Sequence, residues 1–185
     1  MNIANKLTVS RILLVPVFMV CLLGSFPYAQ PLALIVFVGA SATDWLDGYL
    51  ARKYHLITKF GQFMDPLADK LLVMAALIGF VETGALPSWV ALVILARELL
   101  ISIFRAVAAS EGIVIAASKW GKYKTVSQMI MIILMLMNNF PFAAWGIPMD
   151  RLFMWLAVVL TLVSGWDYIY KNRAVLAEGG GKEPA

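Results

Sequence analysis

Residues 12–43 read ILLVPVFMVCLLGSFPYAQPLALIVFVGASAT and contain no charged side chain. A membrane-spanning helix needs about 20 consecutive apolar residues, so this stretch is longer than one span requires. Turn-forming residues interrupt it between Gly24 and Pro31. The stretch therefore predicts two consecutive membrane-spanning helices joined by a short turn, and it classes the chain as an integral membrane protein.

The composition of the rest of the chain supports this class. Of the 185 residues, 62% are hydrophobic and only 14% are charged, whereas a soluble domain carries about 25% charged residues. A second uncharged run lies between Lys124 and Asp150. The long continuous runs are unlike the alternating strands of an outer-membrane barrel, and the first run lacks the small-residue cleavage site of a signal peptide. The single Cys21 excludes an intramolecular disulfide and is expected to be an ordinary apolar side chain.

The turn signals divide the chain into six expected spans. Gly84–Pro87 and Asn138–Pro141 supply two further breaks, and Asp65-Pro66 has the pattern of a helix start. We expect an all-α bundle that forms one domain over residues 1–174, followed by a disordered tail at 175–185. The Met-rich run 129–137 is interpreted as ordinary helix packing. The expected spans are 8–24, 32–52, 66–82, 87–106, 122–140 and 150–170.

The placement of Lys and Arg predicts the orientation in the membrane. If the six spans alternate, one side collects nearly all the basic residues and the other side collects only Arg151. Cytoplasmic loops carry the positive excess, so both termini are expected in the cytoplasm, with the protein in the cell inner (plasma) membrane. This signal also explains the net charge of +4 without a nucleic-acid partner. The basic residues on the cytoplasmic side are Lys6, Arg11, Arg52, Lys53, Lys59, Arg105, Lys119, Lys122, Lys124, Lys171 and Arg173.

Four aspartates lie close to this expected cytoplasmic surface. Asp44 and Asp47 are three residues apart, and Asp65 and Asp69 are four apart, so each pair shares one helical face. A loop of about a dozen residues is expected between the two helices, which places both pairs at the same depth. Four carboxylates packed together repel one another unless a cation compensates them. Carboxylate oxygens suit one or two Mg²⁺ or Mn²⁺ ions, whereas zinc favours His or Cys.

Each of these residues also has a structural interpretation. Asp65 could cap a helix that starts at Pro66, and Asp69 could pair with Lys70 or Arg52 at the surface. Gly48 could serve helix packing instead of ligand approach, and Arg52 could be a positive-inside anchor instead of a phosphate ligand. The only histidine, His55, is interpreted as an exposed loop residue. Asp44 is harder to explain structurally, because it follows an uncharged run and intramembrane carboxylates usually mark function.

Together these residues complete a longer spacing, Asp44-x2-Asp47-Gly48-x2-Ala51-Arg52-x8-Gly61-x3-Asp65-x3-Asp69. It resembles the signature of the CDP-alcohol phosphatidyltransferases at every specified position. The resemblance implies a six-helix membrane enzyme, a homodimer, with two divalent metal ions at a site that faces the cytoplasm. It implies that Asp44, Asp47, Asp65 and Asp69 bind the metal and that Asp69 is also the general base. It further implies that Gly48, Arg52, Thr58, Asn5 and Thr8 contact CDP-diacylglycerol.

Other segments resemble the branch of this family whose acceptor is glycerol 3-phosphate. They are residues 5–11, 43–48, 96–98 and 121–125. The resemblance thus implies transfer of the phosphatidyl group from CDP-diacylglycerol to glycerol 3-phosphate, with release of CMP. An anionic acceptor needs cations of its own, and the candidates are Arg105, Lys119, Lys122 and Lys124. Arg97 and Glu98 lie near mid-span, where we expect them either to pair inside the bundle or to line the pocket.

Three alternatives stay open from the sequence. The same chemistry could use another acceptor, such as inositol phosphate or phosphatidylglycerol. A divalent-cation transporter could use the aspartates as an ion site, although they cluster on one side of the bilayer and Arg52 disfavours a cation path. A non-catalytic scaffold would leave the complete aspartate set unexplained.

Overall fold

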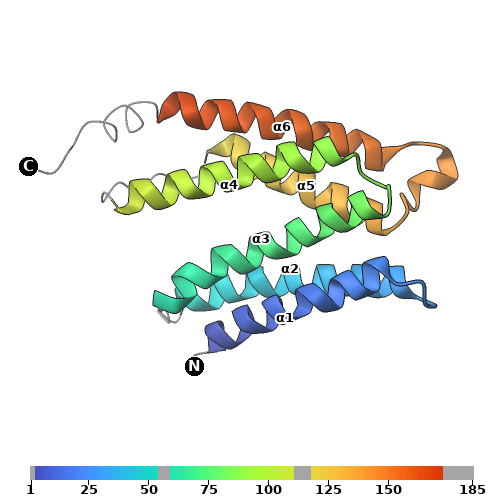
Figure 1. The fold of residues 1–185 in the computed structure, drawn as a ribbon, viewed down its shortest axis with the longest axis horizontal. Coiled ribbons are helices and arrows are strands. Elements are labelled where there is room, and N and C mark those ends of the chain that lie inside the picture. The colour runs from blue at the N-terminus through green and yellow to red at the C-terminus, as the bar shows by residue number, and fades with distance from the viewer. Residues whose placement is uncertain (1–2, 54–58, 111–117, 173–185) are drawn as a thin grey trace, which may run out of the picture.

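The computed structural model describes the backbone of residues 3–53, 59–110 and 118–172. Side chains are described over the same ranges, except at residues 3–8, 44–53, 59–67, 69 and 110. Within these ranges the structure consists of α-helices and one short 3-10 helix, without a β-strand (Figure 1). The described part of the chain is therefore all-α, as predicted.

Each α-helix overlaps one of the expected spans. The elements are α1 (Ile3–Leu23), α2 (Ala29–Lys53), α3 (Lys59–Glu82), α4 (Ser88–Ser110), α5 (Lys119–Leu136), η1 (Phe142–Trp145) and α6 (Met149–Lys171).

The predicted start of the third helix is wrong. Helix α3 begins at Lys59, so Asp65 and Pro66 lie inside the helix and Asp65 does not cap its beginning. A proline inside a helix removes one backbone hydrogen bond and crowds the carbonyl of residue i−4, and membrane helices tolerate both effects. The dozen-residue loop expected between these helices is too long, because α2 extends to Lys53 and α3 begins at Lys59; positions 54–58 lie outside the described residues.

The turn after α5 follows the sequence signal. Asn138 and Asn139 have positive φ angles of 50° and 58°, a conformation that asparagine adopts more readily than most residues. The backbone N–H of Asn139 donates to the carbonyl of Leu134 at 2.8 Å and so closes the end of the helix. The side-chain amides of Asn138 and Gln30 exchange two hydrogen bonds of 2.8 Å, which tie this turn to the first turn of α2.

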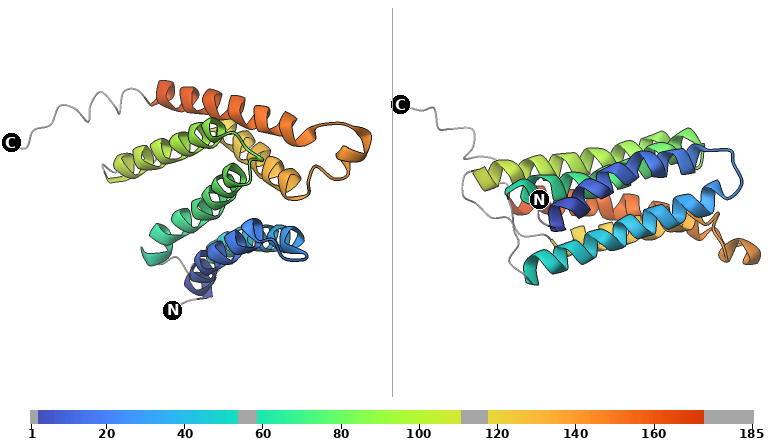
Figure 2. Two further views of the ribbon diagram at one scale, coloured as in Figure 1. Left: turned by 45° about the vertical axis from the view of Figure 1, so that its right-hand side comes forward. Right: turned by 90° about the horizontal axis from the view of Figure 1, so that it is seen from below.

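The helices form two groups that meet along the bundle. Helix α1 packs on α2 and α3, while α6 packs on α5 and α4; contacts of α2 with α5 and of α3 with α4 join the groups. Figures 1 and 2 show that α3 and α4 lie close at their connecting turn and diverge toward the opposite ends. That opposite end of the bundle holds the start of α1, the end of α2 and the start of α3.

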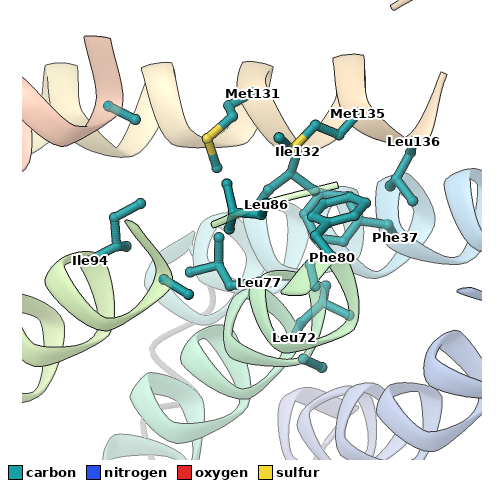
Figure 3. Packing of buried hydrophobic residues seen from close by; sticks show 14 of the residues in the cluster. Phe37, Leu72, Leu77, Phe80, Leu86, Ile94, Met131, Ile132, Met135 and Leu136 are labelled. Carbon is teal, nitrogen blue, oxygen red and sulfur yellow. The ribbon is translucent and has the colours of Figure 1, made fainter. Parts of the chain in front are cut away.

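A continuous apolar core holds the two groups together. Figure 3 shows Phe37, Leu77 and Ile94, from α2, α3 and α4, packed toward Met131 and Ile132 of α5. The Met-rich run thus contributes core side chains, which confirms the packing interpretation. Cys21 is also buried in this core, as expected for a small apolar side chain.

The outer surface of the helices is strongly apolar. Leu100 and Ile103 of α4 are 64% and 61% exposed, and Leu92, Val159 and Leu162 are exposed as well. Soluble monomers seldom present apolar surface on this scale, whereas lipid covers it without cost. In the described residues α6 is long and apolar enough to cross a bilayer, and Val9–Leu23 and Ala29–Thr43 are shorter apolar segments.

Candidate active site

The two aspartate pairs lie on neighbouring helices at one end of the bundle. Asp44 and Asp47 belong to the second half of α2, and Asp65 and Asp69 to the first half of α3. The end of α2 and the start of α3 lie at the same end in all three views of Figures 1 and 2. Because both segments are helical, each pair occupies one helical face, as the spacing predicts.

The aspartate side chains themselves lie outside the described side chains. Among the side chains that are described, no three His, Cys, Asp or Glu residues come together as a metal site. The donor chemistry of the four aspartates fits hard divalent cations, because carboxylate oxygens are the ligands that Mg²⁺ and Mn²⁺ prefer.

Several residues are expected to contact CDP-diacylglycerol. Those whose backbones the structure describes lie at the same end of the bundle as the aspartates. Gly48 and Arg52 belong to the last turns of α2, and Asn5 and Thr8 to the first turns of α1. Their side chains are outside the described set, and Thr58 and His55 lie outside the described residues altogether.

A charge network joins the middle of α4 to the second turn of α5. The ammonium of Lys124 bonds the carboxylate of Glu98, and the guanidinium of Arg97 lies 3.5 Å from the same carboxylate. The Lys124 side chain is only 1% exposed, while that of Glu98 is 21% exposed. Of the two expectations for residues 97 and 98, pairing inside the bundle is therefore confirmed.

Glu98 also lines a small pocket. The pocket has a volume of about 70 Å³ and lies between α3, α4 and α5. Its polar side chains are Lys70, Glu98, Thr125 and Gln128, and its apolar wall consists of Val73, Met74, Leu95 and Met129.

Arg97 crosses from α4 to the backbones of two other helices. A Cβ atom at Gly165 of α6 would lie 3.5 Å from Cγ of Arg97, and one at Gly121 of α5 would lie 3.6 Å from its Nη2. The two glycines thus border the stem and the head of this arginine, and the three helices of the second group converge on it.

The four basic residues proposed for the acceptor phosphate have different environments. Lys119 and Lys122 are exposed on the first turn of α5, whereas Lys124, on the next turn, is buried against Glu98. The guanidinium carbon of Arg105 lies 5.7 Å from the ring centre of Tyr168, on α6. The ring of Phe104 meets the same tyrosine edge-on at 5.6 Å.

Sequence reasoning missed several polar residues of this region. It considered Lys70 only as a partner for Asp69 and did not consider Ser102, Gln128 or Tyr168. The signal for Lys70 was present, because a lysine that enters an apolar run must find a polar partner. No comparable signal marks Ser102 or Gln128, since serine and glutamine occur in many membrane helices without a function.

Comparison with known proteins agrees with this arrangement. The profile of the family described as CDP-alcohol phosphatidyltransferase matches residues 1–163. The chain is 45% identical over 187 residues to the CDP-diacylglycerol–glycerol-3-phosphate 3-phosphatidyltransferase of Bacillus subtilis (strain 168), covering 95% of this chain and 97% of that protein. It is 39% identical to a probable phosphatidylglycerophosphate synthase of Mycobacterium tuberculosis (strain ATCC 25618 / H37Rv), covering 100% of this chain and 87% of the relative. The Rickettsia bellii (strain RML369-C) protein with the same name as the Bacillus relative is 37% identical, covering 90% of this chain and 93% of that protein. The chain therefore belongs to the CDP-alcohol phosphatidyltransferase family.

Proposed function

We propose that this enzyme transfers the phosphatidyl group of CDP-diacylglycerol to glycerol 3-phosphate and releases CMP. The observation that carries the proposal is the complete aspartate signature, whose two halves belong to α2 and α3 at one end of the bundle. The names of the Bacillus, Mycobacterium and Rickettsia relatives support glycerol 3-phosphate as the acceptor.

The protein acts as a six-span enzyme of the cell inner membrane, with both termini and the active site on the cytoplasmic side. Residues 1–174 form its single catalytic domain, and two copies form a homodimer; the tail expected at 175–185 lies outside the described residues. The basic residues gathered at the aspartate end support this orientation, because cytoplasmic segments carry the positive excess. The acyl chains of the donor then stay in lipid while the CDP group reaches the water.

Asp44, Asp47, Asp65 and Asp69 hold two divalent cations, Mg²⁺ or Mn²⁺. When bound, these ions supply positive charge against the diphosphate and the leaving CMP. Asp69 takes the proton of the acceptor hydroxyl as that oxygen attacks the phosphorus attached to the lipid. A new P–O bond forms to the acceptor, the bond to the bridging oxygen breaks, and CMP leaves with that oxygen.

The remaining signature residues bind the donor. Gly48 lets the nucleotide approach the backbone of α2, and Arg52, one turn later, makes bidentate contact with a phosphate. Thr58, together with Asn5 and Thr8 at the start of α1, contacts the CDP-diacylglycerol head group.

Basic side chains of the second helix group bind the acceptor phosphate. Arg105, Lys119, Lys122 and Lys124 are the candidates from the sequence. The environment of Glu98 adds support, because this one carboxylate is bonded by Lys124 and lies beside Arg97. Two cations against one carboxylate leave an excess positive charge among the described side chains, which an anionic substrate would neutralise.

The test is CMP release by the detergent-solubilised protein with CDP-diacylglycerol, in the presence and absence of glycerol 3-phosphate. We expect release to require both glycerol 3-phosphate and Mg²⁺ or Mn²⁺ and to stop when EDTA removes the metal. Asp69→Asn should lower kcat by at least about 10³-fold, since a carboxamide cannot act as a base. The matched control is Asp150→Asn, which removes a carboxylate in the first turn of α6 and should retain activity.

The alternatives give different results in the same preparation. Metal-dependent release with inositol phosphate or phosphatidylglycerol only would keep the family and replace the acceptor. Activity retained by Asp69→Asn would remove the general-base role. Uptake of Mn²⁺ by liposomes that contain the protein and no lipid substrate, with no CMP release, would favour a transporter.

A further inference from the structure

Lys70, the residue directly after Asp69, makes a contact between helices. Its ammonium donates a hydrogen bond to the hydroxyl of Ser102 on α4, 32 residues away in the sequence. Both side chains are half-buried. A lysine inside an apolar helix must find polar partners, and here a hydroxyl on a neighbouring helix provides one.

Ser102 is itself held in place. Its hydroxyl donates to the backbone carbonyl of Glu98, one turn earlier in α4, at 2.5 Å. With its proton engaged there, the oxygen presents a lone pair to Lys70. The chain of hydrogen bonds thus runs from α3 into the backbone of α4, next to the ion pair of Glu98 and Lys124.

This contact lies where apolar packing between α3 and α4 gives way to polar groups. Toward the connecting turn, Leu77 of α3 and Val90 and Ile94 of α4 belong to the buried core. Beyond them the two helices diverge (Figures 1 and 2), and the long side chain of Lys70 reaches across to Ser102. The pocket of about 70 Å³ beside it is large enough to hold water.

We propose that Lys70 and Ser102 form a positioning contact that fixes the rotation and tilt of α3 and thereby the placement of the neighbouring Asp69. This inference rests on the proposed function, in which Asp69 is a metal ligand and the base. Because one helix carries both residues, a contact that holds Lys70 restrains the backbone from which Asp69 projects. A misplacement of about 1 Å at a reacting group costs about 10²-fold in rate, so the contact bears on catalysis without touching the substrate.

The proposal is tested with Lys70→Met, Ser102→Ala and the double variant of the full-length, detergent-solubilised enzyme. Ser102→Thr keeps the hydroxyl and serves as the conservative variant. The matched control is Thr161→Val, which removes a hydroxyl that bonds a carbonyl one turn earlier within α6, at 2.6 Å. For each protein, kcat, the KM for CDP-diacylglycerol and the Mg²⁺ concentration for half-maximal rate are measured, together with Tm.

We expect Lys70→Met and Ser102→Ala each to lower kcat about tenfold or more and to raise the half-maximal Mg²⁺ concentration several-fold. The KM for the donor should stay within about twofold, because the donor-binding residues are unchanged. The kcat of the double variant should lie within about twofold of the kcat of either single variant, since each single substitution already removes the whole contact. Ser102→Thr and Thr161→Val should retain the parent kcat.

Three results would overturn the proposal. The first is a folded Ser102→Ala variant that has the kcat and the Mg²⁺ dependence of the parent enzyme. This result overturns the proposal even if the Lys70→Met variant does not fold. The second is a double variant whose losses multiply. The third is a fall in Tm with no change in the Mg²⁺ requirement, because this is what a merely structural contact gives. Asp69→Asn, assayed in parallel, separates the hypotheses: if it is active, the proposed role of Asp69 fails, and if it is inactive while Ser102→Ala is normal, only this inference fails.

Discussion

At the residue scale, the pair of Lys124 and Glu98 is the most strongly buried charge contact among the described side chains. Burying a lysine that is 1% exposed is costly unless a carboxylate compensates it. The same lysine is a candidate for the acceptor phosphate, so its substitution affects stability and substrate binding together. A double variant isolates the contribution of the ion pair to stability.

We therefore expect Glu98→Leu to lower the free energy of unfolding by about 3–5 kcal/mol, because it leaves the Lys124 ammonium buried without its carboxylate. The double variant Glu98→Leu, Lys124→Met should recover a large part of this loss, because an apolar pair of similar volume replaces the ion pair. The measurement is thermal unfolding of Glu98→Leu, Lys124→Met and the double variant in one detergent. If the double variant is as unstable as the sum of the singles, the pair is not coupled.

At the element scale, a glycine marks a close contact between α1 and α3 in the first group. A Cβ atom added at Gly79 of α3 would overlap the side chain of Leu22 on α1. This glycine therefore lets α1, which carries Asn5 and Thr8, lie directly against α3.

We expect Gly79→Val to destabilise the protein by about 1–3 kcal/mol, because the added side chain overpacks this contact. Leu22→Ala in the same chain should restore part of the stability by making room. Gly39→Ala on α2 is the control, since no atom lies within 4 Å of the added Cβ. The measurement is thermal unfolding of the parent, Gly79→Val, the double variant with Leu22→Ala, and Gly39→Ala. If Gly39→Ala lost as much stability as Gly79→Val, the effect would not be one of packing.

At the scale of the whole molecule, charge is distributed unequally between the two ends of the bundle. The exposed Lys119 and Lys122 at the start of α5 lie at the aspartate end. At the other end, the turns after α1 and α5 expose Tyr28 and Trp145, which are 79% and 68% exposed. Aromatic side chains are enriched at the membrane–water interface, and basic residues favour the cytoplasmic side.

This asymmetry predicts how single cysteines are labelled in intact cells. In a Cys21→Ser background, Tyr28→Cys should react with a membrane-impermeant maleimide from outside. Lys122→Cys should react only after the membrane is opened or inverted. The opposite pattern would invert the proposed topology, and labelling of both positions from one side would contradict the six-span arrangement.

Much of the fold and of the candidate site follows from the sequence alone. The uncharged run 12–43 predicted two helices and the turn between them, which the structure describes as α1 and α2. The interval from Asp44 to Asp69 identified the family and its expected metal ligands. These features are local, because helix length, turn residues and i, i+3 or i, i+4 spacing are set by the chain itself.

The tertiary structure alone decided which distant side chains meet. The sequence did not predict that Lys124 lies against Glu98, 26 residues away, or that Lys70 reaches Ser102. It also misplaced the start of α3, because Asp65-Pro66 has the local pattern of a helix start inside a longer helix. Such contacts depend on the rotation and tilt that each helix acquires when its neighbours pack against it, and no spacing within one helix records those quantities.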